Sequence, residues 1–171
     1  VYHKPESYSS EWLSRDPGRP RLLFKQSGVT KLGSKTILLV ITGFDAERTE
    51  QLITRFEPKQ TILGIQAGDQ FENNRLNLGK HRGVPSFGSN PVKFFELDAY
   101  SEDHGLEAIL SEIKPLVTSD YNIILSSLGP KPSAIALYRA RRRFPEIALA
   151  YTPSNDFNQD YSKGIGLSLW G

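Results

Sequence analysis

Short apolar runs alternate with longer amphipathic stretches along most of this chain, and this alternation constrains its fold more than any other feature. The pattern predicts β-strands at residues 36–42, 61–65, 92–97, 121–126 and 147–151. The first of them is apolar almost throughout, which is typical of a strand that is buried on both faces of a parallel sheet.

Three of the stretches between these strands carry apolar residues at helical spacing. We expect helices that begin at Asp45, as an N-cap, at Ser101 and at Pro132. Residues 67–90 join the second and third strands and show no clear helix. A loop of that length is uncommon in a compact domain, so we expect it to be either functional or mobile.

Strands that alternate with helices form βαβ units, and right-handed crossovers place the helices on both faces of the sheet. We therefore expect an α/β fold of three layers, Rossmann-like, with a mainly parallel sheet of about five strands, over residues 36–171. Residues 1–35 are polar and rich in proline, glycine and basic residues, which predicts an irregular arm or linker. Residues 1–12 weakly resemble residues 150–162 in sequence. An alternative interpretation is therefore that the arm is the tail of a preceding copy of the domain.

Composition excludes several classes of protein. The absence of cysteine excludes a disulfide scaffold and a thiol nucleophile, and no apolar run approaches the roughly 20 residues of a membrane helix. No signal-peptide pattern opens the chain, so we expect a cytoplasmic protein with no membrane partner. The net charge of +2 does not predict a nucleic-acid partner. The chain opens at Val1 and holds no methionine, which predicts that it belongs to a larger protein.

The most informative segment runs from Ser126 to Ser133, between the fourth predicted strand and the third predicted helix. Open parallel sheets bind their ligands outside the carboxyl ends of the strands. Gly129 lets the backbone approach a ligand, the N–H groups of the helix start favour an anion, and Lys131 adds a full charge. Ser127 and the two serines at the ends of the segment add hydroxyl donors. The segment predicts a phosphate-binding loop, and the alternative is a stiff two-proline turn whose lysine faces water.

A second candidate site follows the first strand at Thr42, Gly43, Phe44 and Asp45. A small residue before a capped helix leaves room for a phosphate or a base, and Phe44 could stack on the base. The alternative is that Gly43 serves only the turn and that Phe44 belongs to the core.

Three other groups of charged residues are less informative. The loop of residues 73–83 could close over an anionic ligand or lie solvated on the surface; its basic side chains are Arg75, Lys80, His81 and Arg82. The arginines at 139–143 suit the end of a helix, where cations are favourable. The acidic residues at 98–103 suit a helix start in the same way, so we predict neither a metal nor a cofactor.

The run Ser127-Leu128-Gly129-Pro130-Lys131, with the small-residue helix that follows, resembles the CRISPR-associated Rossmann-fold sensor domains, or CARF domains. The loop of that family typically reads Thr-Gly-Gly-Thr-Lys. Gly129 and Lys131 match its second glycine and its lysine, and Ser127 stands at the first threonine. Leu128 and Pro130 depart from the pattern.

The resemblance spans residues 36–152 and implies a homodimer that binds cyclic oligoadenylates and regulates an attached effector. It implies that Lys131 and Gly129 hold phosphate or ribose and that residues 43–45 flank the base.

Our first hypothesis is therefore a regulatory domain that binds a nucleotide or another phosphorylated small molecule. The first alternative is an enzyme that acts on a nucleotide or sugar phosphate with help from Ser127, Asp45 or His81, although the sequence shows no nucleophile–base pair. The second alternative is an interaction module that uses aromatic residues near the C-terminus, namely Tyr151, Phe157, Tyr161 and Trp170.

Overall fold

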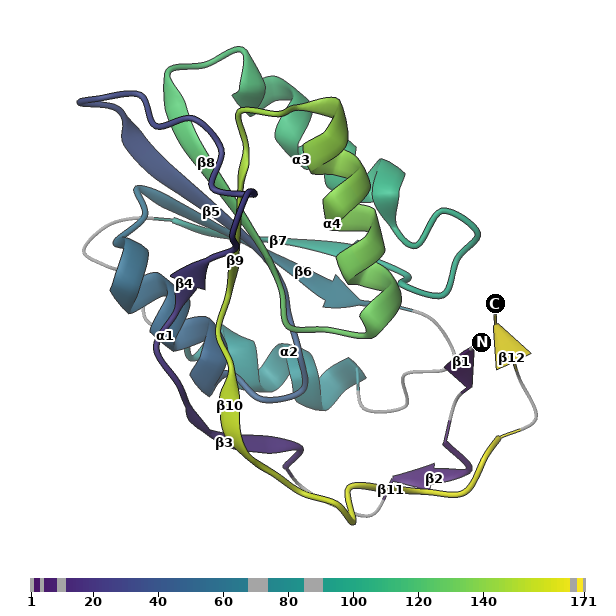
Figure 1. Cartoon of the computed structure of the whole chain (residues 1–171). Coiled ribbons are helices and arrows are strands. Elements are labelled where there is room, and N and C mark those ends of the chain that lie inside the picture. The colour runs from purple at the N-terminus through teal and green to yellow at the C-terminus, as the bar shows by residue number, and fades with distance from the viewer. Residues whose placement is uncertain are drawn as a thin grey trace.

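The structure is a computed structural model that describes residues 2–3, 5–8, 12–67, 74–84, 91–166 and 169–170. Its centre is a six-stranded sheet with the order β4-β9-β8-β5-β6-β7 (Figure 1). The strands of this sheet are β4 (Arg21–Leu22), β5 (Lys35–Ile41), β6 (Gln60–Gln66), β7 (Val92–Leu97), β8 (Tyr121–Ser127) and β9 (Ala148–Tyr151). The strands from β9 to β7 run parallel, and β4 joins β9 antiparallel. The five predicted strands are thus confirmed, and an antiparallel edge strand is added to them.

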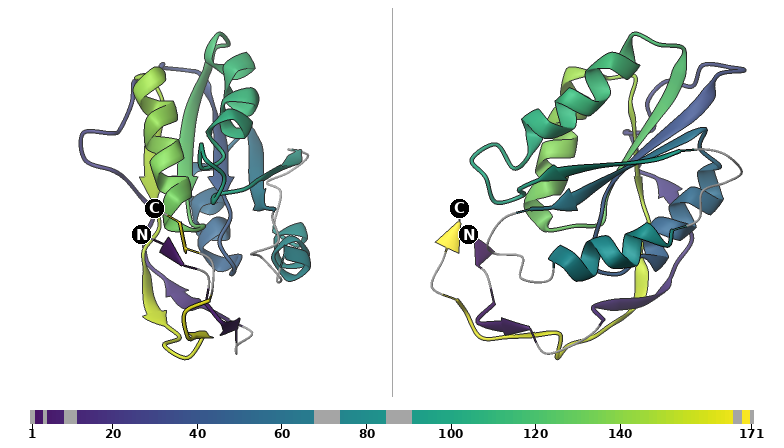
Figure 2. Two further views of the ribbon diagram at one scale, coloured as in Figure 1. Left: turned by 90° about the vertical axis from the view of Figure 1, so that its right-hand side faces the viewer. Right: turned by 180° about the vertical axis from the view of Figure 1, so that it is seen from behind.

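Helices cover both faces of the sheet (Figure 2). They are α1 (Glu47–Phe56), α2 (Asn74–Arg82), α3 (Leu106–Val117) and α4 (Lys131–Arg143). On β5, Ile37, Leu39 and Ile41 pack in the cluster that contains α3 and α4, whereas Leu38 and Val40 pack in the cluster that contains α1. Because both faces of β5 are covered, the central strand is apolar on both sides.

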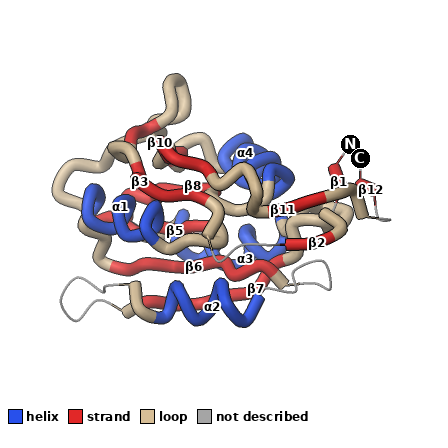
Figure 3. Tube along the Cα trace, turned by 90° about the horizontal axis from the view of Figure 1, so that it is seen from below, coloured by secondary structure: helices blue, strands red, loops and turns tan. Residues whose placement is uncertain are grey.

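The segments near the two ends of the chain pair with each other in three short antiparallel ladders (Figures 1 and 3). We call them together the terminal ribbon; its pairs are β1 (Tyr2–His3) with β12 (Leu169–Trp170), β2 (Ser7–Tyr8) with β11 (Ser162–Lys163), and β3 (Ser14–Pro17) with β10 (Ser154–Phe157). Residues 1–35, in which the sequence showed no strand period, therefore contribute β1–β4. Strands of two to four residues are too short to leave a clear alternation.

Two local predictions were wrong. Residues 74–82 form α2, inside the segment that was predicted without a helix. The low helix propensity of Gly79 and of the asparagines in α2 explains the weak signal. Asp45 is not the N-cap of α1, because Ala46 occupies that position and makes no side-chain cap.

The helix predicted from Ser101 begins at Leu106, and turns over residues 101–105 precede it. The N-cap of this helix is Gly105, and the Asp103 carboxylate accepts the Glu107 N–H at 2.8 Å, the Gly105 N–H at 2.9 Å and the Ser101 hydroxyl at 2.8 Å. Partial burial raises the pKa of Asp103, but these hydrogen bonds lower it, and the pKa lies below its ordinary value overall.

We expect Asp103→Ala to lower the free energy of unfolding by about 1 kcal/mol, because N–H groups at the start of α3 lose a side-chain acceptor. The lowered folded-state pKa means that this contribution is complete above the unfolded pKa of about 3.9 and is lost as the pH falls through the folded-state pKa. Urea unfolding at about pH 7 and pH 3 tests both points. Glu102→Ala, at an exposed neighbour, is the control. If Asp103→Ala lowered the free energy of unfolding by as much at pH 3 as at pH 7, this explanation would be contradicted.

Candidate functional site

The strand order brings the two predicted site segments together. From β5 the chain moves to β6 and β7 on one side, and β8 leads to β9 on the other side. The direction in which successive strands are added to the sheet therefore reverses between the parallel neighbours β5 and β8, where Ile41 lies opposite Ser127. In open α/β sheets a ligand crevice forms outside the carboxyl ends of such a strand pair. Residues 42–45 and 126–133 both leave the sheet at this point.

The two loops touch each other through their glycines. A Cβ on Gly43 would lie 2.4 Å from the carbonyl oxygen of Leu128, and a Cβ on Gly129 would lie 2.9 Å from that of Thr42. The Leu128 N–H donates to the carbonyl of Ile41 at 2.8 Å. A side chain at position 129 would thus project against the turn that follows β5. The glycines serve loop packing whether or not a ligand binds.

Leu128 explains one departure from the CARF loop pattern. Its side chain is buried in the apolar cluster that holds Leu38 and Val40 under α1. The leucine therefore anchors the loop in the core on one face of the sheet. The helix α4, which begins at Lys131, packs on the opposite face of the sheet.

The start of α4 offers less backbone to an anion than the sequence predicted. Pro132 has no N–H group, and the Ser133 N–H donates to the carbonyl of Pro130 at 3.0 Å. The Ser133 hydroxyl donates to the same carbonyl at 2.7 Å and lies 2.8 Å from the Ser127 hydroxyl. In the first three positions of α4, the Lys131 N–H is the one that has no acceptor among the described residues. The exposed ammonium group of Lys131 supplies the charge here, since the first turn holds no acidic residue.

Gln66, the last residue of β6, is a candidate that the sequence analysis missed. It is 3% exposed, and its Oε1 accepts the Ala99 N–H at 3.2 Å. Its Nε2 has no hydrogen-bond partner within the described part of the chain and lies 3.1 Å from the position that a Cβ would take on Gly129. The amide group thus faces residues 126–133, which we call the Lys131 loop. A polar residue that closes an apolar strand was the available signal.

Ser126 and Thr42 face the other side of the sheet. Ser126 lies opposite Val40 in register and is 1% exposed, and its hydroxyl has no partner among the residues described. Thr42 is fully buried and donates to the carbonyl of Gly64 at 2.9 Å. The structure therefore gathers Ser127, Ser133 and Lys131 beside α4 and separates Ser126 and Thr42 from them.

Phe44 and Asp45 contact α2 and segments near the two ends of the chain. The Asp45 carboxylate accepts the backbone N–H groups of Leu13 and Ser14, each at 2.8 Å, and the ammonium of Lys80 at 3.0 Å. That ammonium also lies 3.8 Å from the centroid of the Phe44 ring, which the Tyr161 ring meets edge-on at 5.3 Å. The turn after β5 thus joins α2 and the terminal ribbon to the sheet.

Each residue of the enzyme alternative contacts another group of the protein. His81 is 1% exposed, and its Nε2 lies 3.2 Å from the Thr49 hydroxyl. Asp45 serves backbone groups, and Ser127 lies against Ser133. In the described ranges no group of three His, Cys, Asp or Glu residues is placed to hold a metal ion. No helix within those ranges is long and apolar enough to span a membrane.

The aromatic residues of the interaction alternative are dispersed. Tyr151 lies under Arg48, whose guanidinium is 5.1 Å from the ring centroid and donates to the carbonyl of Thr152. Burial lowers the pKa of Arg48, and Tyr151 and Asp45 oppose this shift. Phe157 is 54% exposed. The side chains of Trp170 and of Arg75 lie outside the described residues.

Comparison with known proteins gives no family for the chain. No protein-family model matches it, and no curated protein matches its sequence. Among solved structures it is similar to that of Can2 from Sulfobacillus thermosulfidooxidans in complex with cyclic tetra-adenylate, with 16% identity and a TM-score of 0.44. The match covers 63% of this chain and 29% of that chain, so the chain spans less than a third of that protein. A likeness at this level gives no conclusion about function.

Proposed function

We propose that the chain is a regulatory domain that binds a nucleotide or another phosphorylated small molecule at the carboxyl ends of β5, β6 and β8. The observation that carries this proposal is the buried Gln66 amide, which faces the Lys131 loop without an acceptor among the described residues. A buried donor without an acceptor costs free energy, and a ligand oxygen would relieve that cost.

The charged side chains in the first turns of the helices favour the start of α4, rather than the start of α1, as the phosphate-binding site. Glu47 and Glu50 lie in the first turn of α1, and Asp45 precedes it. The first turn of α4 has no acidic residue and begins with Lys131. An anion is therefore repelled from α1 and attracted to α4, where the positive end of the helix dipole adds to the lysine.

The sequence resemblance makes cyclic oligoadenylates the first ligand class to test. Under this proposal Lys131 binds a phosphate, and the amide of Gln66 donates to a base or ribose oxygen. The serine pair Ser127 and Ser133 lies beside them and supplies hydroxyl groups. Homodimer formation and attachment to an effector are part of the same proposal. Sedimentation at two protein concentrations tests the dimer, and a strict monomer would remove that part.

A thermal-shift screen tests the proposal. It compares mononucleotides, linear and cyclic oligoadenylates and sugar phosphates on the wild type and on Lys131→Ala. A ligand at 100 times its dissociation constant stabilises the folded state by about 2.7 kcal/mol. We expect a stabilisation by one ligand class that Lys131→Ala removes. Lys59→Ala, an exposed lysine just before β6, is the matched control and should keep it. No shift with any ligand would reduce the loop to a structural turn.

A further inference from the structure

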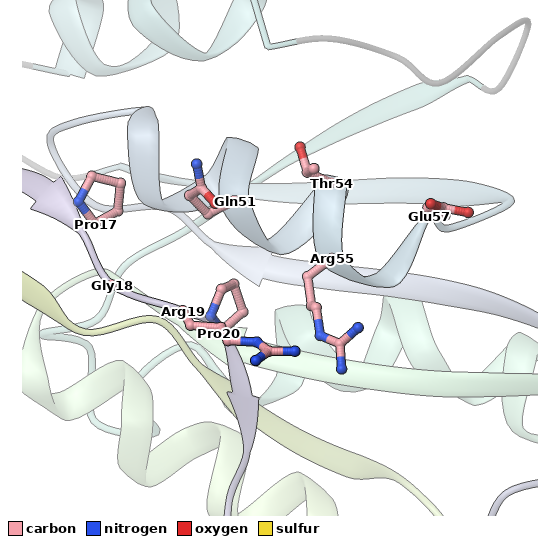
Figure 4. A pocket seen from close by; sticks show the side chains of 8 residues that line it. All are labelled: Pro17, Gly18, Arg19, Pro20, Gln51, Thr54, Arg55 and Glu57. Carbon is pink, nitrogen blue, oxygen red and sulfur yellow. The ribbon is translucent and has the colours of Figure 1, made fainter.

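A groove with a volume of about 440 Å³ lies between α1 and residues 17–20 (Figure 4). It is lined by the segment between β3 and β4 and by α1 with its C-cap, through Pro17, Gly18, Arg19, Pro20, Gln51, Thr54, Arg55 and Glu57. None of these residues belongs to the Lys131 loop, which enters α4 on the opposite face of the sheet. A volume of this size is in the range of sites for small molecules.

One wall of the groove is rigid. Pro17 and Pro20 fix the backbone on both sides of Gly18 and Arg19. The Gly18 N–H donates to the carbonyl of Pro153 at 2.9 Å, and a Cβ on Gly18 would lie 2.8 Å from the Pro153 ring. The backbone beside Arg19 is thus held against the chain that follows β9, and the Arg19 side chain starts from a fixed backbone position.

The groove holds two guanidinium groups without a carboxylate partner. Arg19 and Arg55 are both exposed and extend to the same side of α1 (Figure 4). Within the described ranges neither has an acidic group within 4.0 Å. Arg55 lies in the last turn of α1, where the helix dipole favours a positive charge. The dipole does not explain the position of Arg19, which lies outside the helix. The lining of the groove therefore carries two guanidinium groups and one carboxylate, that of Glu57, which leaves an excess of positive charge.

We infer that this groove is a second ligand site, which binds the phosphate of a nucleoside monophosphate between Arg19 and Arg55. One guanidinium group can donate two parallel hydrogen bonds to two oxygens of a phosphate, and a lysine ammonium cannot form this bidentate arrangement. Glu57 lies at one end of the groove and offers acceptor oxygens to ribose hydroxyls. Pro17 lies toward the other end and offers an apolar ring to the base. The site does not depend on the function proposed for the Lys131 loop.

Nuclear magnetic resonance of the nitrogen-15 arginine side chains tests this inference with adenosine monophosphate and adenosine as probes. We expect adenosine monophosphate to shift the Nε–Hε signals of Arg19 and Arg55 in a saturable way. The double variant Arg19→Gln/Arg55→Gln should weaken this binding at least tenfold. Arg142→Gln, at an exposed arginine of α4, should leave it unchanged. Adenosine should not shift the two arginine signals.

Three results would overturn the inference. The first is the absence of a saturable shift at either arginine, and the second is an unchanged affinity in the double variant. The third is an equal response to adenosine, because the phosphate would then contribute nothing. Lys131→Ala separates the two sites: it should abolish ligand binding at the Lys131 loop and leave the arginine shifts intact. Circular dichroism of the double variant checks that it remains folded.

Discussion

Replacing Gly43 with alanine is expected to lower the free energy of unfolding by about 3 kcal/mol, in the upper range for an overpacked site. The added Cβ would lie 2.4 Å from the carbonyl oxygen of Leu128, far inside van der Waals contact. That oxygen belongs to the backbone, and the neighbouring Leu128 N–H is bonded to Ile41, so the loop cannot simply move away. The clash separates the two loops that follow the neighbouring strands β5 and β8.

Gly79→Ala is the matched control for Gly43→Ala. Gly79 lies in α2, and a Cβ there would meet nothing within 4 Å. Alanine should therefore stabilise the helix by roughly 0.5–1 kcal/mol. Urea unfolding of the two variants measures both effects. A Gly43→Ala protein as stable as the wild type would show that the two loops are not in contact.

The second large effect is expected for Asp45→Ala, which should lower the free energy of unfolding by about 3 kcal/mol. Hydrogen bonds to a charged group contribute about 1.5–3 kcal/mol, and the substitution removes two from backbone groups and an ion pair with Lys80. The N–H groups of Leu13 and Ser14 would lose their acceptor. We therefore expect the terminal ribbon to loosen before the central sheet.

Hydrogen exchange locates this effect. Amides of β3 and β10 should exchange faster in Asp45→Ala, whereas those of β5 and β8 should keep their protection relative to global unfolding. Asp45→Asn keeps one acceptor oxygen and should lose less stability. Asp156→Ala, an exposed residue of β10 in the same ribbon, is the control and should change little. Unchanged protection of β3 in Asp45→Ala would contradict the role assigned to this carboxylate.

The elements of the sheet could be predicted because burial on both faces leaves a strong pattern. The side chains of β5 alternate between two apolar clusters, so the strand reads as a continuous apolar run. The order of the strands could not be predicted, because periodicity identifies elements but not their neighbours. The short strands of the terminal ribbon were missed since each spans only two to four residues.

The candidate site was predictable only in part, for a related reason. The position of Lys131 after a strand and before a helix is a local feature, and the sequence shows it. The partners of Asp45 lie more than 30 residues away in the sequence, and the amide of Gln66 reaches a loop that follows a different strand. Contacts over such separations leave no local pattern, so the mistaken N-cap at Asp45 and the missed Gln66 have the same physical origin.

The most direct test of the central proposal follows the side-chain amide of Gln66 by nitrogen-15 resonance while a ligand is added. The ligands are adenosine monophosphate and a cyclic oligoadenylate. We predict that one of them shifts the Gln66 amide and the Lys131 N–H together and to saturation, and that Lys131→Ala abolishes both shifts. Signals of Gln66 and of residues 126–133 that stay unmoved with every ligand of the screen would contradict the proposed binding site.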